Sequence, residues 1–387
     1  MKYNNLGLGV SIGWAWGVIF HDIIAILVIG LFYKDMLIMA KPGIDVCAYF
    51  RQFRGQTVTL VGVFPLPLGG IAVHLKRLEA ALIRDQCLVW RWDVCRQQQG
   101  ISQLRYYLRL LQFGLFRRSQ VLLYHTLPLR STPLELVILI LIRMLTGARL
   151  VVVLHSGRFV SSMRKPYRWM ISRLLRHQAE VVMVGKHLQQ ELWQNGLRLS
   201  GRITVDTPFL PPEIGQRTQI LARTSADLNC FMTQSKPLII VAVTRLDDWQ
   251  GEDLYGTDLA LAAFERFKSD FPQAGLLLVV GNMNGRSLQI GSQTYLLKEW
   301  VEEIWPLIGL ADLFLRPTRT DVSSISVAEA LWQGVPTIAS DCCPRLKGVT
   351  LFKSGKADDL YLKMVEIWQK SMSLKPGLRQ NKLDMLR

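Results

Sequence analysis

Two acidic side chains, Asp321 and Glu329, are separated by seven residues in the segment RPTRTDVSSISVAEALWQGVPTIASD, residues 316–341. Apolar LFL runs into this segment, SVAEALWQG has helical spacing, and VPTIAS is again extended, so the pattern predicts strand, loop, helix and strand. The N–H groups at the start of such a helix attract a phosphate group. The two carboxylates could then accept hydrogen bonds from sugar hydroxyls on either side of that phosphate.

The same helix start also has a purely structural interpretation. Ser326 is a favourable N-cap residue, and Glu329 follows it three residues later. In such a capping box the carboxylate accepts a hydrogen bond from the N–H group of the cap residue. Glu329 is therefore either a capping residue or a ligand-binding residue, and this segment alone leaves both interpretations open.

Strands and helices alternate along most of the chain from residue 57 onward. TVTLVGVF predicts a buried strand, PLPLGG a turn and IAVHLKRLEAAL an amphipathic helix, and similar pairs continue as far as Gly196. A second series begins at PLIIVAVTRL and ends in the segment described above. Such alternation predicts parallel, doubly wound sheets. Ligands of open sheets bind at the carboxyl ends of the strands, where Gly69, Gly70 and Asp321 are expected.

The chain of 387 residues is too long for one ordinary core, so two domains are expected. Three prolines, Pro208, Pro211 and Pro212, interrupt the alternation between the two series. We therefore expect an α/β protein with two doubly wound domains on either side of a cleft. Its expected parts are an apolar N-terminal extension or membrane-associated segment at 1–45, a first domain at 46–212, a linker at 213–236 and a second domain at 237–387.

The composition is that of a packed globular protein with a strong positive charge. Hydrophobic residues make up 50% of the chain and charged residues 20%, which argues against disorder. The net charge of +16 favours phosphate-rich partners, namely nucleic acid, an anionic membrane or a nucleotide-activated substrate. The six cysteines form no CxxC pair and no histidine cluster has metal-ligand spacing, so no metal site is expected.

Several stretches favour a membrane surface. Residues 7–33 are almost uninterruptedly apolar apart from His21 and Asp22, and they read as a membrane anchor, an interfacial helix or a non-native extension. LRYYLRLLQFGLFRRSQ and RKPYRWMISRLLRH interleave basic residues with Leu, Trp and Tyr. This pattern suits an anionic membrane better than nucleic acid, although ordinary packing helices would also explain it.

Five motifs together resemble, in order and spacing, those of retaining glycosyltransferases of family 4. They are PLPLGGIAVHLKRL, VVVLHSGRF, VAVTRL, YGTDLALAAF and FLRPTRTDVSSISVAEALWQGVPTIASD, and they cover about residues 57 to 355. The resemblance implies the GT-B fold, with two Rossmann-like domains facing across a cleft. It is closest to enzymes of bacterial surface-polysaccharide synthesis, such as those for O-antigen, capsule or exopolysaccharide.

The resemblance also implies roles for individual residues. Glu329 would hold the ribose of a nucleotide-sugar donor, and Asp321, where the family usually has Glu, would hold the donor sugar. Arg245 would bind the diphosphate of the leaving nucleotide, unless it forms a surface salt bridge with Asp247 or Asp248. His155 would lie near the transferred sugar, or would be an ordinary histidine at a strand end. The donor would further contact Gly69, Gly70, Ser323, Ser324, Ile325 and Ser326. Arg286, which follows a predicted strand, would supply additional positive charge.

The chain departs from the family pattern at two points. The lysine that usually precedes glycine and helps to bind the diphosphate is replaced by Tyr255, before Gly256. Val322 and Ser323 replace the glycine and acidic residue that often follow the first acid. Two rivals therefore stay open: a catalytically inactive GT-B-like binding protein and a nucleotide-sugar epimerase of related fold.

The activity implied is transfer of a sugar from a nucleotide diphosphate sugar, with retention and without a cofactor or metal. The expected acceptor is a glycan linked to polyprenyl diphosphate, and the expected location is the cytoplasmic face of the inner membrane. We expect an anionic membrane surface as a partner and no nucleic acid.

Overall fold

The computed structural model describes residues 47–65, 69–95, 102–125, 132–156, 160, 165–300 and 302–374. All of them belong to one compact unit, Asp45–Arg387. The apolar N-terminal extension expected at 1–45 lies outside the described residues. Within the part that is described, no helix combines the length and the apolar character needed to cross a bilayer.

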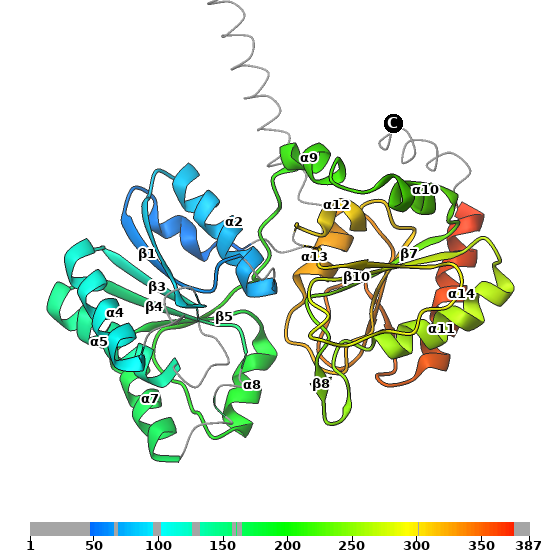
Figure 1. The fold of residues 1–387 in the computed structure, drawn as a ribbon. Helices are drawn as coiled ribbons and strands as arrows, with labels where there is room; N and C mark the ends of the chain where they lie inside the picture. Colours follow the sequence, from blue (N-terminus) through cyan, green and yellow to red (C-terminus); the bar gives the residue numbers. More distant parts are fainter. Residues whose placement is uncertain are drawn as a thin grey trace, which may run out of the picture. The chain divides into compact units, whose positions relative to one another are not determined.

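The first half contains a six-stranded sheet in which every pair of neighbouring strands is parallel (Figure 1). The strand order is β2-β1-β3-β4-β5-β6, so the direction of winding reverses at β1. The central strands β3 and β4 are almost entirely buried, as is typical of a parallel sheet covered on both faces. The strands are β1 (Thr57–Gly62), β2 (Leu88–Asp93), β3 (Val121–His125), β4 (Arg149–Leu154), β5 (Glu180–Met183) and β6 (Ile203–Val205).

Helices cover both faces of this first sheet. Along β4, Leu150 and Val152 contribute to one apolar core, and Val151 and Val153 contribute to another. Because alternate residues of a strand point to opposite faces, the two cores lie on opposite sides of the sheet. One side carries the 3₁₀-helix η1 (Tyr49–Phe53) and α2 (Gly70–Arg84). The other carries α4 (Gln103–Arg117), α5 (Thr132–Thr146), α7 (Lys165–Gln178) and α8 (Lys186–Gln194).

The second half repeats the same architecture. Its parallel sheet has the order β11-β10-β7-β12-β13-β14, so winding reverses at β7. The strands are β7 (Leu238–Val243), β10 (Gly275–Val280), β11 (Thr294–Lys298), β12 (Leu313–Arg316), β13 (Thr337–Ser340) and β14 (Thr350–Phe352). The flanking helices are α11 (Thr257–Asp270) and α14 (Ala357–Leu374) on one face, and α10 (Ala226–Gln234), α12 (Trp305–Ile308) and α13 (Ile325–Trp332) on the other. A two-stranded hairpin, β8 (Asp248–Trp249) and β9 (Glu252–Asp253), follows β7. These two sheets confirm the predicted pair of doubly wound domains.

The segment expected to be a polar linker, residues 213–236, contains η2 (Ile214–Gln216), α9 (Arg217–Leu221) and α10. Leu228 and Met232 are one helical turn apart in α10, and both are buried in the core of the second half. The linker interpretation overlooked this apolar pair. Much of the segment is therefore packed against the second half.

Candidate functional site

A pocket of about 310 Å³ lies at the carboxyl ends of strands from both sheets. The residues directly after β4 and the start of α2 in the first half border it, together with β7, β12 and α13 of the second half. This is where ligands bind in open parallel sheets, close to the point at which winding reverses. Of the residues expected to bind or act on a donor, those that line it are Gly69, Gly70, His155, Asp321, Ser323, Ser324, Ile325, Ser326 and Glu329. Arg245 and Arg286 are absent from the lining.

Helix α13 points its first turn at this pocket. Its N-cap residue is Ser324, whose Oγ accepts a hydrogen bond from the Val327 N–H at 3.4 Å and lies 3.0 Å from the Ser326 Oγ. Ser326 is therefore inside the helix, and the predicted capping box between Ser326 and Glu329 is wrong. The remaining N–H groups and the helix dipole make this turn suitable for binding a phosphate.

The Glu329 carboxylate pairs with Arg77, which the sequence did not identify as part of the site. Glu329 is only 2% exposed, and its Oε1 accepts a hydrogen bond from Nη2 of Arg77 on α2. No hydrogen bond links its second oxygen, Oε2, to any described residue. Arg77 thus fixes one oxygen of the carboxylate and leaves the other for a ligand in the pocket.

Arg77 binds a second buried carboxylate at the same time. Its Nη2 and Nε donate to Oε2 of Glu303 at 2.6 and 3.1 Å, and its Nη1 donates to the Leu210 carbonyl oxygen at 2.9 Å. Lys76 Nζ lies 2.8 Å from the other oxygen of Glu303. Burial would raise the pKa of Glu303, but Arg77 and Lys76 outweigh it and hold that pKa below its ordinary value. For Glu329, burial outweighs Arg77 and raises the pKa.

Asp321 is held between two guanidinium groups. Its Oδ2 lies 2.8 Å from Arg345 Nη1 and 3.3 Å from Arg316 Nε, and its Oδ1 accepts a hydrogen bond from the Val322 N–H. Burial would raise the pKa of Asp321, but Arg316 and Arg345 hold it below its ordinary value. The carboxylate is therefore ionised at neutral pH and remains able to accept hydrogen bonds from hydroxyl groups.

Arg316 brings a positive charge to the pocket beside Tyr255, the residue that replaces the family's lysine. Its guanidinium carbon lies 5.3 Å from the ring centroid of Tyr255, and both residues line the pocket. Nη1 donates to the Ala242 carbonyl oxygen at 3.2 Å, whereas Nη2 makes no hydrogen bond to any described residue. Sequence reasoning missed Arg316 because it ends a strand that was interpreted only as apolar.

The two arginines expected at the diphosphate lie elsewhere in the second half. Arg245 is exposed, and its Nη2 lies 2.8 Å from Oδ2 of Asp247, which is the salt bridge that the sequence left open as an alternative. Arg286 binds both carboxylate oxygens of Asp248, each at 2.5 Å. The charge of each is thus paired with a neighbouring acid outside the pocket, and a role in donor binding stays a prediction for both.

Close backbone contacts require glycine at Gly281, in the pocket lining, and at Gly256, next to Tyr255, but not at the two glycines expected. Gly69 and Gly70 have no positive φ, and a Cβ at either would meet only ordinary contacts. Gly281 lines the pocket, and a Cβ there would lie 2.6 Å from the Thr244 carbonyl oxygen. Gly256, the N-cap of α11, has a φ of 67°, and a Cβ there would lie 2.0 Å from the Pro317 carbonyl oxygen. Gly256 and Gly281 are therefore the positions that require glycine.

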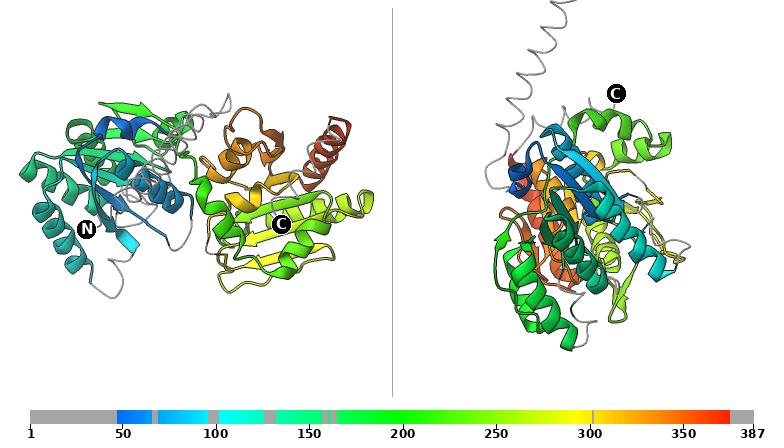
Figure 2. Two further views of the ribbon diagram at one scale, coloured as in Figure 1. Left: turned by 90° about the horizontal axis from the view of Figure 1, so that it is seen from above. Right: turned by 90° about the vertical axis from the view of Figure 1, so that its left-hand side faces the viewer.

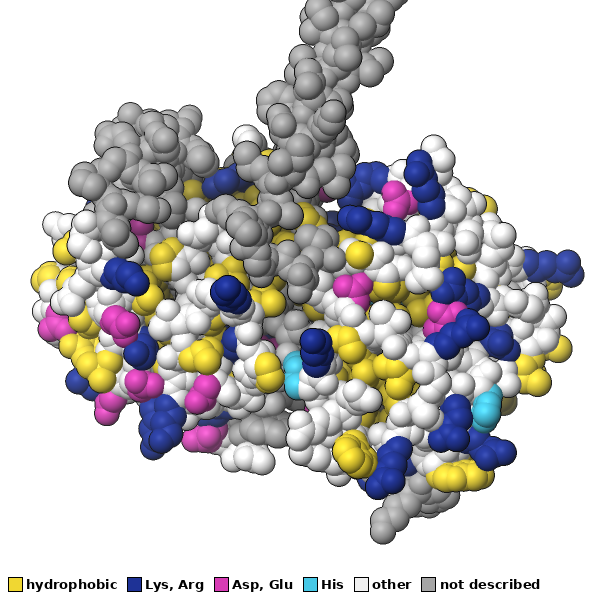
Figure 3. Space-filling view, turned by 180° about the vertical axis from the view of Figure 1, so that it is seen from behind, with side chains coloured by type: hydrophobic (Ala, Val, Ile, Leu, Met, Phe, Trp, Pro, Cys, Tyr) yellow, Lys and Arg dark blue, Asp and Glu magenta, His cyan; other side chains and the backbone are white. Residues whose placement is uncertain are grey.

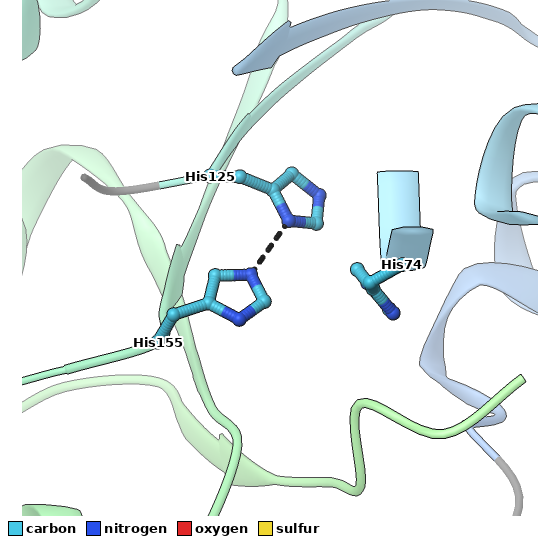
Figure 4. Close-up of side chains that lie close together, drawn as sticks. All are labelled: His74, His125 and His155. Atoms are coloured by element: carbon cyan, nitrogen blue, oxygen red, sulfur yellow. Dashed lines mark hydrogen bonds between the residues drawn. The ribbon is translucent and has the colours of Figure 1, made fainter. Parts of the chain in front are cut away.

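Three buried histidines lie close together, and one of them, His155, lines the pocket (Figure 4). His74 comes from α2, His125 ends β3 and His155 follows β4. His125 Nδ1 and His155 Nε2 are hydrogen-bonded at 2.9 Å, and His74 Nδ1 donates to the Pro208 carbonyl oxygen at 2.7 Å. Burial lowers the pKa of His74 to about 4 and the pKa values of His125 and His155 well below the ordinary value. All three are therefore neutral at pH 7.

Within the described residues, these histidines are the group that could supply three metal ligands, since their nitrogen atoms lie within 4.8 Å of one another. A tetrahedral zinc ion needs its ligand atoms roughly 3.3 Å apart, as follows from Zn–N bonds of about 2.0–2.1 Å. The hydrogen-bonded pair His125 Nδ1 and His155 Nε2, at 2.9 Å, would therefore have to separate before both could bind one ion. As arranged, the cluster offers neutral imidazole groups for hydrogen bonding beside the pocket.

Residues 237–370 match the model of the family Glycosyl transferases group 1. The match spans the sheet of the second half and helix α13, and it confirms the family resemblance there. Comparison with curated protein sequences finds no match.

Solved structures with the same fold are glycosyltransferases of the GT-B type. HepE from Anabaena in complex with UDP-glucose is 14% identical, with a TM-score of 0.56 over 85% of this chain and 94% of that one. Sucrose-phosphate synthase from Thermosynechococcus elongatus is 15% identical, with a TM-score of 0.57 over 86% and 94%. A UDP-forming α,α-trehalose-phosphate synthase from Burkholderia vietnamiensis is 11% identical, with a TM-score of 0.55 over 85% and 94%. These likenesses show that the chain has the GT-B fold.

Proposed function

We propose that the protein transfers a sugar from a nucleoside diphosphate sugar to a glycan or lipid-linked acceptor. The observation that carries this proposal is the pocket itself, which is lined by residues of the family-like motifs from both halves of the chain, although not by Arg245. UDP-glucose is bound in the HepE structure, so a UDP-sugar is the first donor to test.

The described side chains suggest a place for each part of the donor. The first turn of α13, with Ser324 at its N-cap, would bind the diphosphate. Arg316 would add the positive charge that the replacement of lysine by Tyr255 removes. Glu329 would use its second oxygen for the ribose hydroxyls, and Asp321 would accept hydrogen bonds from the donor sugar.

Catalysis would rest on stabilising the leaving nucleotide diphosphate. Negative charge grows on the diphosphate as the sugar departs, so Arg316 and the start of α13 bind it more strongly in the transition state than in the ground state. These groups would stabilise that charge without a bound metal ion. We propose transfer with retention, in which the acceptor hydroxyl approaches the same face of the sugar, beside His155.

The acceptor and location are proposed on the family resemblance and the basic charge of the chain. A glycan on polyprenyl diphosphate would bring the reaction to the cytoplasmic face of the inner membrane. Surface polysaccharide synthesis, including lipopolysaccharide or capsule, is the process in which such acceptors are used.

One rival function is favoured by a specific observation. Tyr255 replaces the family's lysine, and Arg245 is paired with Asp247 outside the pocket. A protein of this kind could bind a nucleotide sugar without transferring it. Binding without nucleotide release would then distinguish a binding protein from an enzyme.

A matched pair of variants tests the assignment of the site. Glu329 and Glu303 are both buried and both bind Arg77, so Glu329→Gln and Glu303→Gln remove the same kind of charge from the same arginine. If Glu329 binds ribose, its amide variant loses a charge-assisted acceptor, and UDP affinity or turnover falls roughly tenfold to over a hundredfold. Glu303 also lines the pocket, but both of its carboxylate oxygens are already paired, one with Lys76 and one with Arg77, so Glu303→Gln should change UDP affinity less.

The measurements are titration calorimetry with UDP and UDP-glucose, and UDP release in the presence of a lipid-diphosphate acceptor. Equal losses in both variants, or full activity in Glu329→Gln, would return Glu329 to a structural role. If UDP-glucose binds but no nucleotide is released with any donor of a panel, the result supports the alternative that the chain is a binding protein.

A further inference from the structure

Three neighbouring helices of the first half carry almost only positive charge. Helices α4, α5 and α7 contain eight Lys and Arg residues, three in α4, one in α5 and four in α7. Their only acidic residue, Glu135, is fully buried and accepts hydrogen bonds from the hydroxyls of Tyr106 and Tyr124 at 2.9 and 2.6 Å. The outer surface of these helices therefore has no carboxylate of their own to balance its arginines.

The same helices expose an unusual number of large apolar side chains. Of those exposed among the described residues, half lie on α4, α5 and α7. The most exposed are Phe116, at 85%, Leu104, at 69%, and Trp169, at 68%. The others are Leu108, Leu134, Val137, Leu141, Met144 and Leu145. Because water disfavours a concentration of apolar surface, such a patch indicates a binding surface.

The apolar and basic side chains share one layer of the fold. α4 packs against α5, α5 packs against α7, and all three contribute to the core on the same face of the first sheet. Their opposite sides thus form one outer face, and these helices of the first half turn toward the viewer in the right-hand view of Figure 2. Figure 3 shows the molecule from behind, where basic and apolar side chains also lie at the surface of the first half.

We propose that the outer face of α4, α5 and α7 binds the surface of an anionic lipid bilayer. Arginines attract the anionic headgroups, and the apolar side chains between them enter the boundary with the acyl chains. Arg105 and Arg109 form no ion pair with any described residue, so their charge is available to a partner. Nucleic acid would use the arginines, but it offers no apolar region for Leu, Val and Met side chains.

The face is separate from the residues that line the donor pocket. No residue of α4, α5 or α7 borders that pocket. The inference therefore goes beyond sugar transfer, and it predicts that membrane binding and nucleotide binding can be changed independently.

The test compares full-length variants in co-sedimentation with vesicles of phosphatidylcholine alone and of equal parts phosphatidylcholine and phosphatidylglycerol. The charge variant combines Arg105→Glu, Arg109→Glu and Arg173→Glu. The apolar variant combines Leu108→Ser, Phe116→Ser and Trp169→Ser. All six side chains are exposed, so folding should be preserved and thermal melting checks this.

Controls of the same chemistry come from the second half. Lys347→Glu, Lys353→Glu and Lys356→Glu change the net charge by the same amount, and Leu362→Ser with Met372→Ser removes comparably exposed apolar groups from α14. Each basic residue near an anionic surface contributes about a fivefold increase in binding.

We expect the charge variant to bind the anionic vesicles at least tenfold more weakly than its control, and the apolar variant to bind both kinds of vesicle more weakly. UDP affinity should stay unchanged in both, so failure here is distinguishable from failure of the proposed function. Unchanged vesicle binding in both variants would overturn the proposal. A wild-type protein that binds a short RNA duplex but not the vesicles would overturn it in favour of nucleic acid.

Discussion

At the scale of single residues, the question is which cation faces the diphosphate. Arg316 lines the pocket and lies over Tyr255, whereas Arg286 is bound to Asp248 on both of its terminal nitrogens. A bidentate pair with an exposed carboxylate already neutralises Arg286, whereas Arg316 shares Asp321 with Arg345, so two guanidinium groups face one carboxylate there. The structure therefore favours Arg316 over the arginine that the sequence suggested.

Arg316→Gln should weaken UDP binding by about tenfold to a hundredfold, since hydrogen bonds to charged groups are worth roughly 1.5–3 kcal/mol. Arg316→Lys should recover part of the loss because the positive charge returns. Arg286→Gln is the matched control, and UDP affinity should be nearly unaffected. Titration calorimetry decides between them, and the reverse order of effects would restore Arg286 to the site.

The pocket residues that could be predicted from the sequence are those that belong to a recognisable motif. The carboxylates Asp321 and Glu329, the glycines of α2 and His155 all reached the pocket as expected. Their partners were not foreseen, because Arg77 precedes Glu329 by 252 positions and nothing in a local pattern pairs two such residues. Local spacing predicts which groups face the ends of strands, but it cannot predict which opposite charge the other half supplies.

At the scale of elements, the sequence predicted helix α13 but misplaced its first residue. Ser326 and Ser324 are both good N-cap residues, and the glutamate three positions after Ser326 favoured the wrong one. Tertiary contacts decided otherwise, because Glu329 is drawn to Arg77 and cannot return to a cap. The helix therefore begins one residue before the predicted cap.

Two single substitutions separate these alternatives. Ser324→Ala removes the side chain that accepts from the Val327 N–H, so the free energy of unfolding should fall by about 1 kcal/mol. Ser326→Ala lies within the helix, where alanine is the better former, and should cost a few tenths of a kcal/mol at most. Urea unfolding measures both. A larger loss in Ser326→Ala would contradict the observed cap.

At the scale of the whole molecule, the two halves repeat one topology and meet at a buried ion network. The repetition was predictable, because strand and helix patterns recur in order along the chain. The network was not, because Arg77 belongs to α2 while Glu303 and Glu329 belong to the second half. Removing a single partner of a buried ion pair leaves an uncompensated charge, which is strongly destabilising.

Arg77→Met should therefore lower the free energy of unfolding by roughly 3–5 kcal/mol near neutral pH.

In the wild type, burial raises the pKa of Glu329, while Arg77 and Lys76 hold the pKa of Glu303 below its ordinary value. Without Arg77, the pKa of Glu329 in the folded state should rise further above its value in the unfolded chain, and the pKa of Glu303 should rise from its lowered value. A carboxyl whose pKa is raised in the folded state destabilises the fold as the pH rises and it loses its proton. The stability returns as the pH falls and the carboxyl takes up a proton again. The deficit of Arg77→Met should accordingly shrink as the pH falls from neutral toward the ordinary pKa of a glutamate, about 4.3. Arg91→Met is the control, because Arg91 pairs with Glu79 at 3.7 Å near the surface and should cost at most about 1 kcal/mol. Thermal and urea unfolding across this pH range test the prediction, and equal, pH-independent deficits in the two variants would show that the network does not join the halves.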